Sequence, residues 1–157
     1  MTSRQYLLRL KSVFFSILLT ALLIGAISYF MLQPSNGLAN GQSLYFMMGF
    51  GIAIFCLLLY ILLNKQKNQE AAEFPKLSDK LIAFQNNYLT SISLLLAPTL
   101  VNFILYGIGG PMFNFYIGLF LTGLLAGRFP TITLLSKSLE LKEKDIKNLQ
   151  EDQFKLI

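Results

Sequence analysis

The hydrophobic residues of this chain are gathered into four blocks, and polar residues fill the segments between them. The blocks contain no Asp, Glu, Lys or Arg, and they cover residues 12–32, 43–63, about 89–108 and about 111–127. A helix crosses a bilayer core about 30 Å thick with roughly 20 apolar residues. The pattern therefore predicts an all-α integral membrane protein with four transmembrane helices in up-down antiparallel order.

The polar segments define the organisation expected around these helices. Residues 1–130 are predicted to form a four-span bundle in which residues 64–88 are a cytoplasmic loop, and residues 131–157 form a cytoplasmic helical tail. Residues 107–111 contain three glycines and a proline, a composition typical of a tight turn. The third and fourth spans should therefore form a close hairpin.

The basic residues predict the orientation in the membrane. All thirteen Lys and Arg lie before the first block, between the second and third, or after the fourth. Positively charged segments stay in the cytoplasm, so both termini and residues 64–88 are expected there. Lys- and Asn-rich cytoplasmic segments and short outer loops, without Asn-x-Ser/Thr sites, are typical of a bacterial cytoplasmic (inner) membrane. The excess of five positive charges is interleaved with acids, which argues against nucleic-acid binding.

Two cytoplasmic segments have a helical apolar pattern. Leu77, Leu81, Phe84 and Tyr88 share one face of a helix, which either rests on the membrane surface before turning into the third span or packs as a lead-in on its own bundle. The tail forms one helix with a weak heptad pattern or two short helices with a break after Leu141. The tail either packs on the bundle or docks a partner, and the candidate docking residues are Leu135, Leu139, Ile146 and Leu149.

Small residues line one face of three of the four spans. Helices associate in lipid through close approach at such residues. The residues expected in bundle packing are Ala21, Gly25, Ser28, Gly49, Ala53, Cys56, Gly118 and Thr122. Gly123 and Gly127 lie on a neighbouring face of the fourth span and form a candidate helix-packing interface, within the bundle or with a second copy or partner.

Few residues of the chain are suited to chemistry. The chain has no histidine and one cysteine, Cys56, and only 13% of its residues are charged against 54% hydrophobic. Intramembrane sites usually contain ionisable groups, and the four blocks have none. A soluble enzyme and a disulfide scaffold are therefore excluded as classes. We expect no enzymatic activity, no cofactor, and no catalytic or metal-ligating residues.

One intramembrane polar group stands out in the third block. Pro98 should kink its helix, and Asn102 lies one turn later with Ser and Thr residues nearby. Asn114 in the fourth block extends this candidate polar site. The group is either a kink closed by an interhelical hydrogen bond or the lining of a polar cavity for a headgroup or small solute.

Two functions fit these observations. The first is a non-catalytic accessory, assembly or scaffolding subunit of a larger membrane complex, with the lipid bilayer and a membrane-protein partner or a second copy around it. The alternative is a small oligomeric transporter, flippase or channel whose polar site lies near Pro98 and Asn102.

Overall fold

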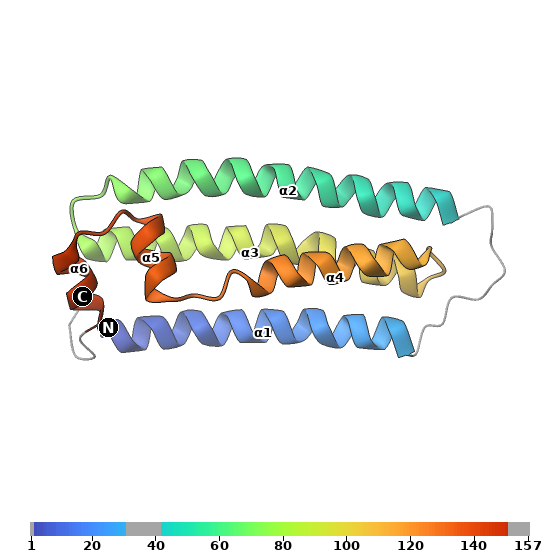
Figure 1. The fold of residues 1–157 in the computed structure, drawn as a ribbon, viewed down its shortest axis with the longest axis horizontal. Coiled ribbons are helices and arrows are strands. Elements are labelled where there is room, and N and C mark those ends of the chain that lie inside the picture. Colours follow the sequence, from blue (N-terminus) through green and yellow to red (C-terminus); the bar gives the residue numbers. More distant parts are fainter. Residues whose placement is uncertain (1, 31–41, 151–157) are drawn as a thin grey trace. The chain divides into compact units, whose positions relative to one another are not determined.

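A computed structural model describes residues 2–30 and 42–150, and the described chain is helical, without strands. The helices, drawn in Figure 1, are α1 (Ser3–Phe30), α2 (Gln42–Ala72), α3 (Leu77–Gly107), α4 (Met112–Ala126), α5 (Ile132–Ser138) and α6 (Glu143–Gln150).

Three of these helices are long and apolar enough to cross a membrane. They are α1, α2 and α3, whose apolar helical segments have 27, 30 and 31 residues. The all-helical structure is consistent with the predicted helical membrane protein. The fourth helix, α4, is apolar but has 15 residues, which gives it a length of about 22 Å. It is shorter than the predicted span because Pro111 precedes it and Gly127 and Pro130 follow it, and proline cannot continue a helix.

The long helices extend well beyond the apolar blocks. Residues 64–72, in the predicted connection between the second and third spans, continue α2, and α3 begins at Leu77, shortly after Pro75. Most of the connection over residues 64–88 is therefore helical, in agreement with the helical pattern predicted from Leu77 to Tyr88. Since α3 runs unbroken from Leu77 to Gly107, the alternative of a separate surface helix before the third span is wrong. The segment is a lead-in to the span.

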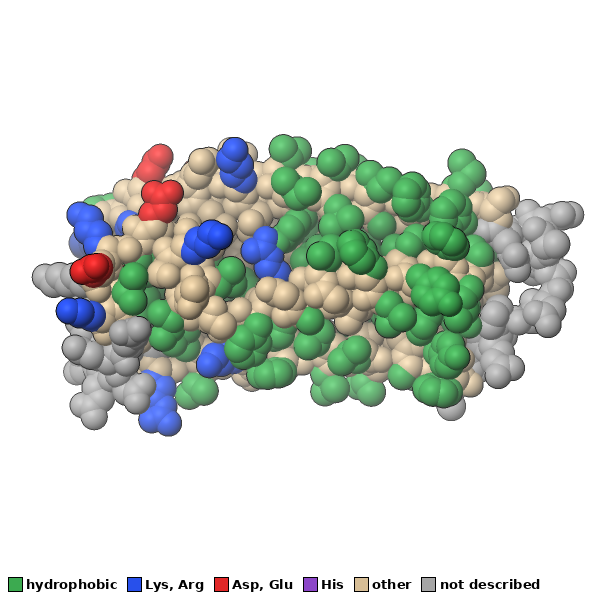
Figure 2. Space-filling view, viewed as in Figure 1, with side chains coloured by type: hydrophobic (Ala, Val, Ile, Leu, Met, Phe, Trp, Pro, Cys, Tyr) green, Lys and Arg blue, Asp and Glu red, His purple; other side chains and the backbone are tan. Residues whose placement is uncertain are grey.

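The chain separates into two compact units. Unit 1 comprises residues 1–15, 61–91 and 129–157, and unit 2 comprises residues 16–60 and 92–128. Every acidic residue and every basic residue except Arg128 belongs to unit 1. Figure 2 shows the charged side chains gathered over the segments of unit 1, while hydrophobic side chains cover those of unit 2. Unit 2 therefore has the composition of a membrane-embedded body.

The core of unit 1 is formed by the amphipathic face of α3 and by the tail. Leu81, Phe84 and Tyr88 are buried, as packing of the lead-in predicts, and the Tyr6 hydroxyl donates a 2.8 Å hydrogen bond to the Leu81 carbonyl. The described part of the tail, residues 131–150, forms two helices, as the two-helix alternative predicts. They separate at Glu140, which has a left-handed φ of 47°. Thr131 starts α5 by accepting a hydrogen bond from the Leu134 amide.

The core of unit 2 is organised around the ring of Phe103. A Cβ atom at Gly25 on α1 would lie 2.9 Å from the ring, and one at Gly118 on α4 would lie 2.6 Å from it. The ring is 1% exposed, so it fills the notch between two glycines and has no free space on either side.

The predicted packing residues are buried, except Cys56, which is half-buried. The predicted hairpin of α3 and α4 is closed at Gly109, whose φ of 107° suits glycine.

The two glycine pairs of α4 differ in their surroundings. Gly118 touches Phe103, whereas Gly123 is exposed, and no other described group lies within 4 Å of the position that a Cβ atom would take there. Gly127 is also exposed, and its Cβ position meets only the backbone of its own helix end. These two glycines are therefore outside the internal packing, and their role as an interface with a second copy or partner stays a prediction.

Substitution of these glycines tests the notch around Phe103. We expect Gly118→Ala to lower the free energy of unfolding by about 1–3 kcal/mol, because the ring is held from the other side and cannot move away. Gly123→Ala, the same change about one and a half turns further along α4, should leave stability unchanged or raise it slightly. Thermal unfolding of both variants in detergent measures the difference, and equal losses would contradict the packing described.

Candidate functional site

The candidate polar site is formed by two asparagines that point at the backbone of α2. Asn102 on α3 and Asn114 on α4 are both fully buried, at 0% exposure. The Nδ2 atom of Asn102 donates to the Gly49 carbonyl at 3.1 Å and to the Pro98 carbonyl at 2.9 Å. The Nδ2 atom of Asn114 donates to the Tyr45 carbonyl at 3.0 Å. The predicted interhelical hydrogen bond is therefore present, and its acceptor lies on α2.

Gly49 is the point where the two amides meet. A Cβ atom at this position would collide with Oδ1 of Asn102 and would lie 3.2 Å from Nδ2 of Asn114. Tyr45 and Gly49 are one helical turn apart, so their carbonyls lie along the same side of α2. The absence of a side chain at residue 49 is what lets both amides reach this backbone.

The acceptor halves of the same two side chains are unsatisfied within the described chain. Among its residues, Oδ1 of Asn102 and Oδ1 of Asn114 are buried without a hydrogen-bond donor. The orientation of each amide is fixed, because exchanging its O and N would turn an oxygen toward a carbonyl oxygen. A buried carbonyl without a donor costs about 1–3 kcal/mol. Both side chains are therefore packed inside unit 2 with their oxygens unsatisfied by the described residues.

Pro98 supports this site from within α3. The helix continues through Pro98, which is buried, and the Pro98 carbonyl receives the second hydrogen of the Asn102 amide. The neighbouring Thr99 hydroxyl is satisfied by the Leu95 carbonyl at 2.7 Å. Pro98 and Asn102 therefore act together, as their spacing predicts, while the Thr99 hydroxyl is bonded within its own helix.

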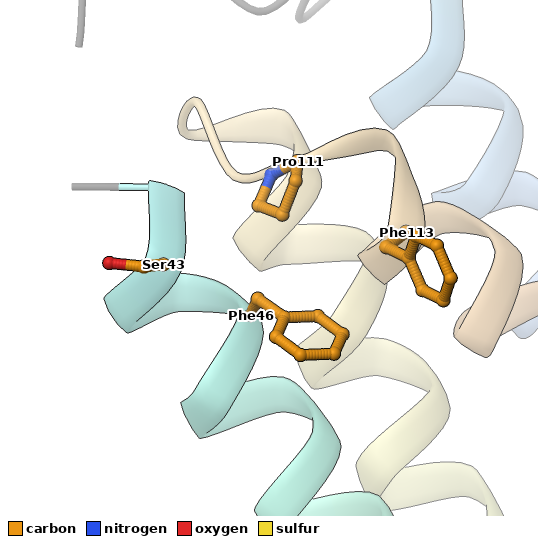
Figure 3. A pocket seen from close by; sticks show the side chains of 4 residues that line it. All are labelled: Ser43, Phe46, Pro111 and Phe113. Atoms are coloured by element: carbon orange, nitrogen blue, oxygen red, sulfur yellow. The ribbon is translucent and has the colours of Figure 1, made fainter. Parts of the chain in front are cut away.

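An apolar groove lies between the starts of α2 and α4, next to these hydrogen bonds. It has a volume of about 350 Å³ and is lined by Ser43, Phe46, Pro111 and Phe113 (Figure 3). The rings of Phe46 and Phe113 meet edge to face, with centroids 5.6 Å apart. The hydrogen bond from Asn114 to Tyr45 joins the same two helix ends that wall this groove.

The charged end of unit 2 is a single arginine. Arg128 follows α4, and its guanidinium lies 4.9 Å from the centre of the Tyr60 ring, a cation–π contact. Partial burial lowers the pKa of Arg128 from its ordinary value, because desolvation disfavours the charged form. The contact fixes the end of α4 against α2.

In unit 1, polar side chains also hold α2 and α3 together. Asn87 donates to the Lys67 carbonyl at 2.7 Å, and the Ser91 hydroxyl donates to the Asn64 side chain at 3.2 Å. The described residues contain no group of three or more His, Cys, Asp or Glu side chains that could hold a metal ion.

The candidate docking residues of the tail are largely covered by the chain itself. Leu135 and Leu139 are fully buried, Leu149 is 2% exposed, and Ile146 is half-buried. A partner that bound this apolar stripe would have to displace it from unit 1. The surface that the tail presents outward is charged, with Lys137, Lys142 and Lys147 exposed.

The sequence analysis identified both asparagines but missed their acceptors. Nothing in the sequence marks the Tyr45 carbonyl as an acceptor, and Gly49 is predicted only as a packing residue. The missed signal was the match between a polar amide on one helix and a glycine on another, since only glycine leaves a helix backbone open to a side chain. Comparisons with known protein families, with curated proteins and with solved structures give no match to this chain.

Substitution of the glycines of α2 tests the site. We expect Gly49→Ala to lower the free energy of unfolding by about 1–3 kcal/mol, because the new methyl group collides with the Asn102 amide. Gly51→Ala is the matched control, since no other described group lies within 4 Å of its Cβ position. Denaturation in mixed micelles measures both, and a neutral Gly49→Ala would mean that the amides do not approach α2 as described.

Proposed function

We propose that this chain is a non-catalytic accessory, assembly or scaffolding subunit of a larger complex in a bacterial cytoplasmic membrane. The proposal rests on the hydrogen bonds that the intramembrane polar side chains make. The Nδ2 atoms of Asn102 and Asn114 are bonded to backbone carbonyls of α2, where they hold helices together. Side chains committed in this way support a structural role for the bundle.

The uneven burial of the helices supports the same proposal. In the most apolar part of each helix, 50% of the residues of α3 are buried, against 22% in α1 and 11% in α2. A helix such as α2, held by a few hydrogen bonds and a narrow strip of small residues, leaves most of its surface outside the packing of the chain. Such a surface suits contact with lipid or with the helices of a partner.

The proposed topology has four spans, with α4 lying in the bilayer beside α3 and both termini in the cytoplasm. The concentration of charge in unit 1 supports it, because Lys and Arg are retained on the cytoplasmic side. Because α4 is short, its Arg128 end would lie below the membrane interface. A long basic side chain can extend from that depth to the interface.

Cysteine labelling tests this topology. The chain has one cysteine, so Cys56→Ser gives a background without thiols. In intact cells, we expect a membrane-impermeant maleimide to label Ser35→Cys in the outer loop and to spare Thr133→Cys in the tail, because only the former would lie outside the cell. Both should react once the membrane is permeabilised. The opposite labelling pattern would refute the orientation.

Purification from the native membrane tests the role. In mild detergent, we expect a larger membrane protein to accompany the chain at a fixed stoichiometry. Reversal of the exposed tail charges, with Lys137→Glu, Lys142→Glu and Lys147→Glu together, should reduce the bound partner several-fold if the tail docks it through its outer face. Unchanged thermal stability of this variant is the control. A clean monomer or homo-oligomer in native detergent extracts would contradict the proposal.

A small oligomeric transporter, flippase or channel is the second candidate. The Oδ1 atoms of Asn102 and Asn114, which find no donor in the described part of the chain, favour it. Unpaired acceptors inside a membrane are the kind of group that handles a polar solute. Movement of lipid or solute by the protein alone in reconstituted vesicles would support this function over the first.

A further inference from the structure

The first turns of α1 carry three positive charges and no negative one. Arg4, Arg9 and Lys11 precede the apolar segment of this helix, and the chain has no acidic residue before Glu70. The apolar segment begins directly after Lys11, so in a helix that crosses a bilayer this lysine lies at the depth of the lipid headgroups. The position of Lys11 follows from a membrane-spanning α1 alone and does not depend on the accessory role.

The Lys11 side chain is held against a cluster of three aromatic rings. Its Nζ atom lies 5.7 Å from the centre of the Phe129 ring. Phe129 in turn meets Phe14 and Phe15 edge to face, with ring centroids 5.5 and 5.6 Å apart. All four residues belong to unit 1, and Lys11 is half-buried. This lysine therefore has less conformational freedom to lose on binding than a lysine that extends into solvent.

Exposed apolar side chains adjoin Lys11 on the outward side of α1. Leu8 lies one turn before Lys11 and Phe15 one turn after it, and both are 56% exposed. Arg4 is also exposed and lies on the same side, about two turns before Lys11. Along its length, this side of α1 therefore presents a cation, an apolar side chain, a second cation and an aromatic ring.

We propose that this surface, formed by Arg4, Leu8, Lys11, Phe15 and Phe129, binds the headgroup of an anionic phospholipid. The Lys11 ammonium donates hydrogen bonds to the lipid phosphate, and the acyl chains run past Phe15 along the apolar segment of α1. Basic side chains attract anionic lipids at a membrane surface, and α1 itself supplies no carboxylate to compete with the phosphate. Half-burial of Lys11 strengthens the attraction, because less water screens the charge.

Quenching by brominated lipids tests the proposal. The chain has no tryptophan, so Leu19→Trp introduces a single fluorescent reporter. Leu19 is 57% exposed and lies about two turns beyond Lys11, outside the proposed headgroup surface. The variant is placed in phosphatidylcholine vesicles that contain increasing amounts of brominated phosphatidylglycerol, or of phosphatidylcholine brominated on the same acyl chains. A bound anionic lipid predicts that the phosphatidylglycerol quenches the tryptophan at a several-fold lower mole fraction.

Three substitutions in this background locate the binding. Lys11→Gln should abolish the preference for phosphatidylglycerol, because it removes the cation held at the rings. Arg9→Gln is the matched control: it removes the same charge from the same helix, but about 200° around it from Lys11, and should keep the preference. Phe129→Leu keeps every charge and removes the ring that orders Lys11, so it should reduce the preference. Circular dichroism checks that each variant stays helical.

The combined results decide between a site and a diffuse attraction. A preference that is lost in Lys11→Gln, reduced in Phe129→Leu and kept in Arg9→Gln supports the proposal. Equal quenching by the two brominated lipids overturns it, and this comparison leaves the headgroup surface intact, so an unstable variant does not decide the result. Equal losses in Lys11→Gln and Arg9→Gln, or a full preference in Phe129→Leu, would show that charge alone attracts the lipid and would also overturn it.

Discussion

The hydrogen bond from the Asn102 side chain to the Gly49 carbonyl is the interaction on which the arrangement of unit 2 depends. Lipid tails are as apolar as leucine side chains, so helices in a bilayer gain little from burying leucine against each other. Close backbone approach and polar bonds must supply the specificity instead. Gly49 provides the close approach and Asn102 the bond, and Asn114 repeats the contact one turn away at Tyr45.

A neighbouring face of the same turn of α3 contacts its partner helices through an aromatic ring instead of a polar group. Phe103, the residue after Asn102, inserts its ring between Gly25 of α1 and Gly118 of α4. Adjacent residues on a helix point about 100° apart, so this one turn of α3 faces α2 with an amide and α1 and α4 with a ring. Three glycines on three helices receive two consecutive side chains. The register of α1, α2 and α4 against α3 is fixed at this level.

Hydrophobic pattern and small-residue spacing predicted much of this arrangement. They located the apolar helices, the tight turn near Gly109 and the buried faces of Ala21, Gly25 and Ser28. They predicted the helical lead-in of α3 from Leu77, but they left open whether α2 runs on past its apolar block, because residues 64–72 are polar and also form helices well. The change from apolar to polar residues indicates where a span leaves the bilayer. A helix itself ends where its backbone hydrogen bonding is interrupted, which for α2 and α3 is near Pro75.

For a related reason, the sequence predicts the two donor side chains of the candidate site but not the backbone carbonyls that accept from them. An asparagine in an apolar block must find a partner, so Asn102 and Asn114 are visible in the sequence. Their partners are backbone carbonyls, which every residue has, and only the shape of the folded helices selects Tyr45 and Gly49. The same limit applies to Gly118 and Gly123, which are identical in the sequence and differ in whether a ring happens to face them.

A double-mutant cycle between Asn102 and Gly49 tests the central interaction most directly. Replacing Asn102 with Ala removes the amide that a side chain at residue 49 would meet. The account predicts that Gly49→Ala, costly in the native chain, then costs less than about 0.5 kcal/mol, which gives a coupling energy of at least about 0.5 kcal/mol. Equal costs of Gly49→Ala in the two backgrounds would show that the amide and the glycine do not meet, and would contradict the account.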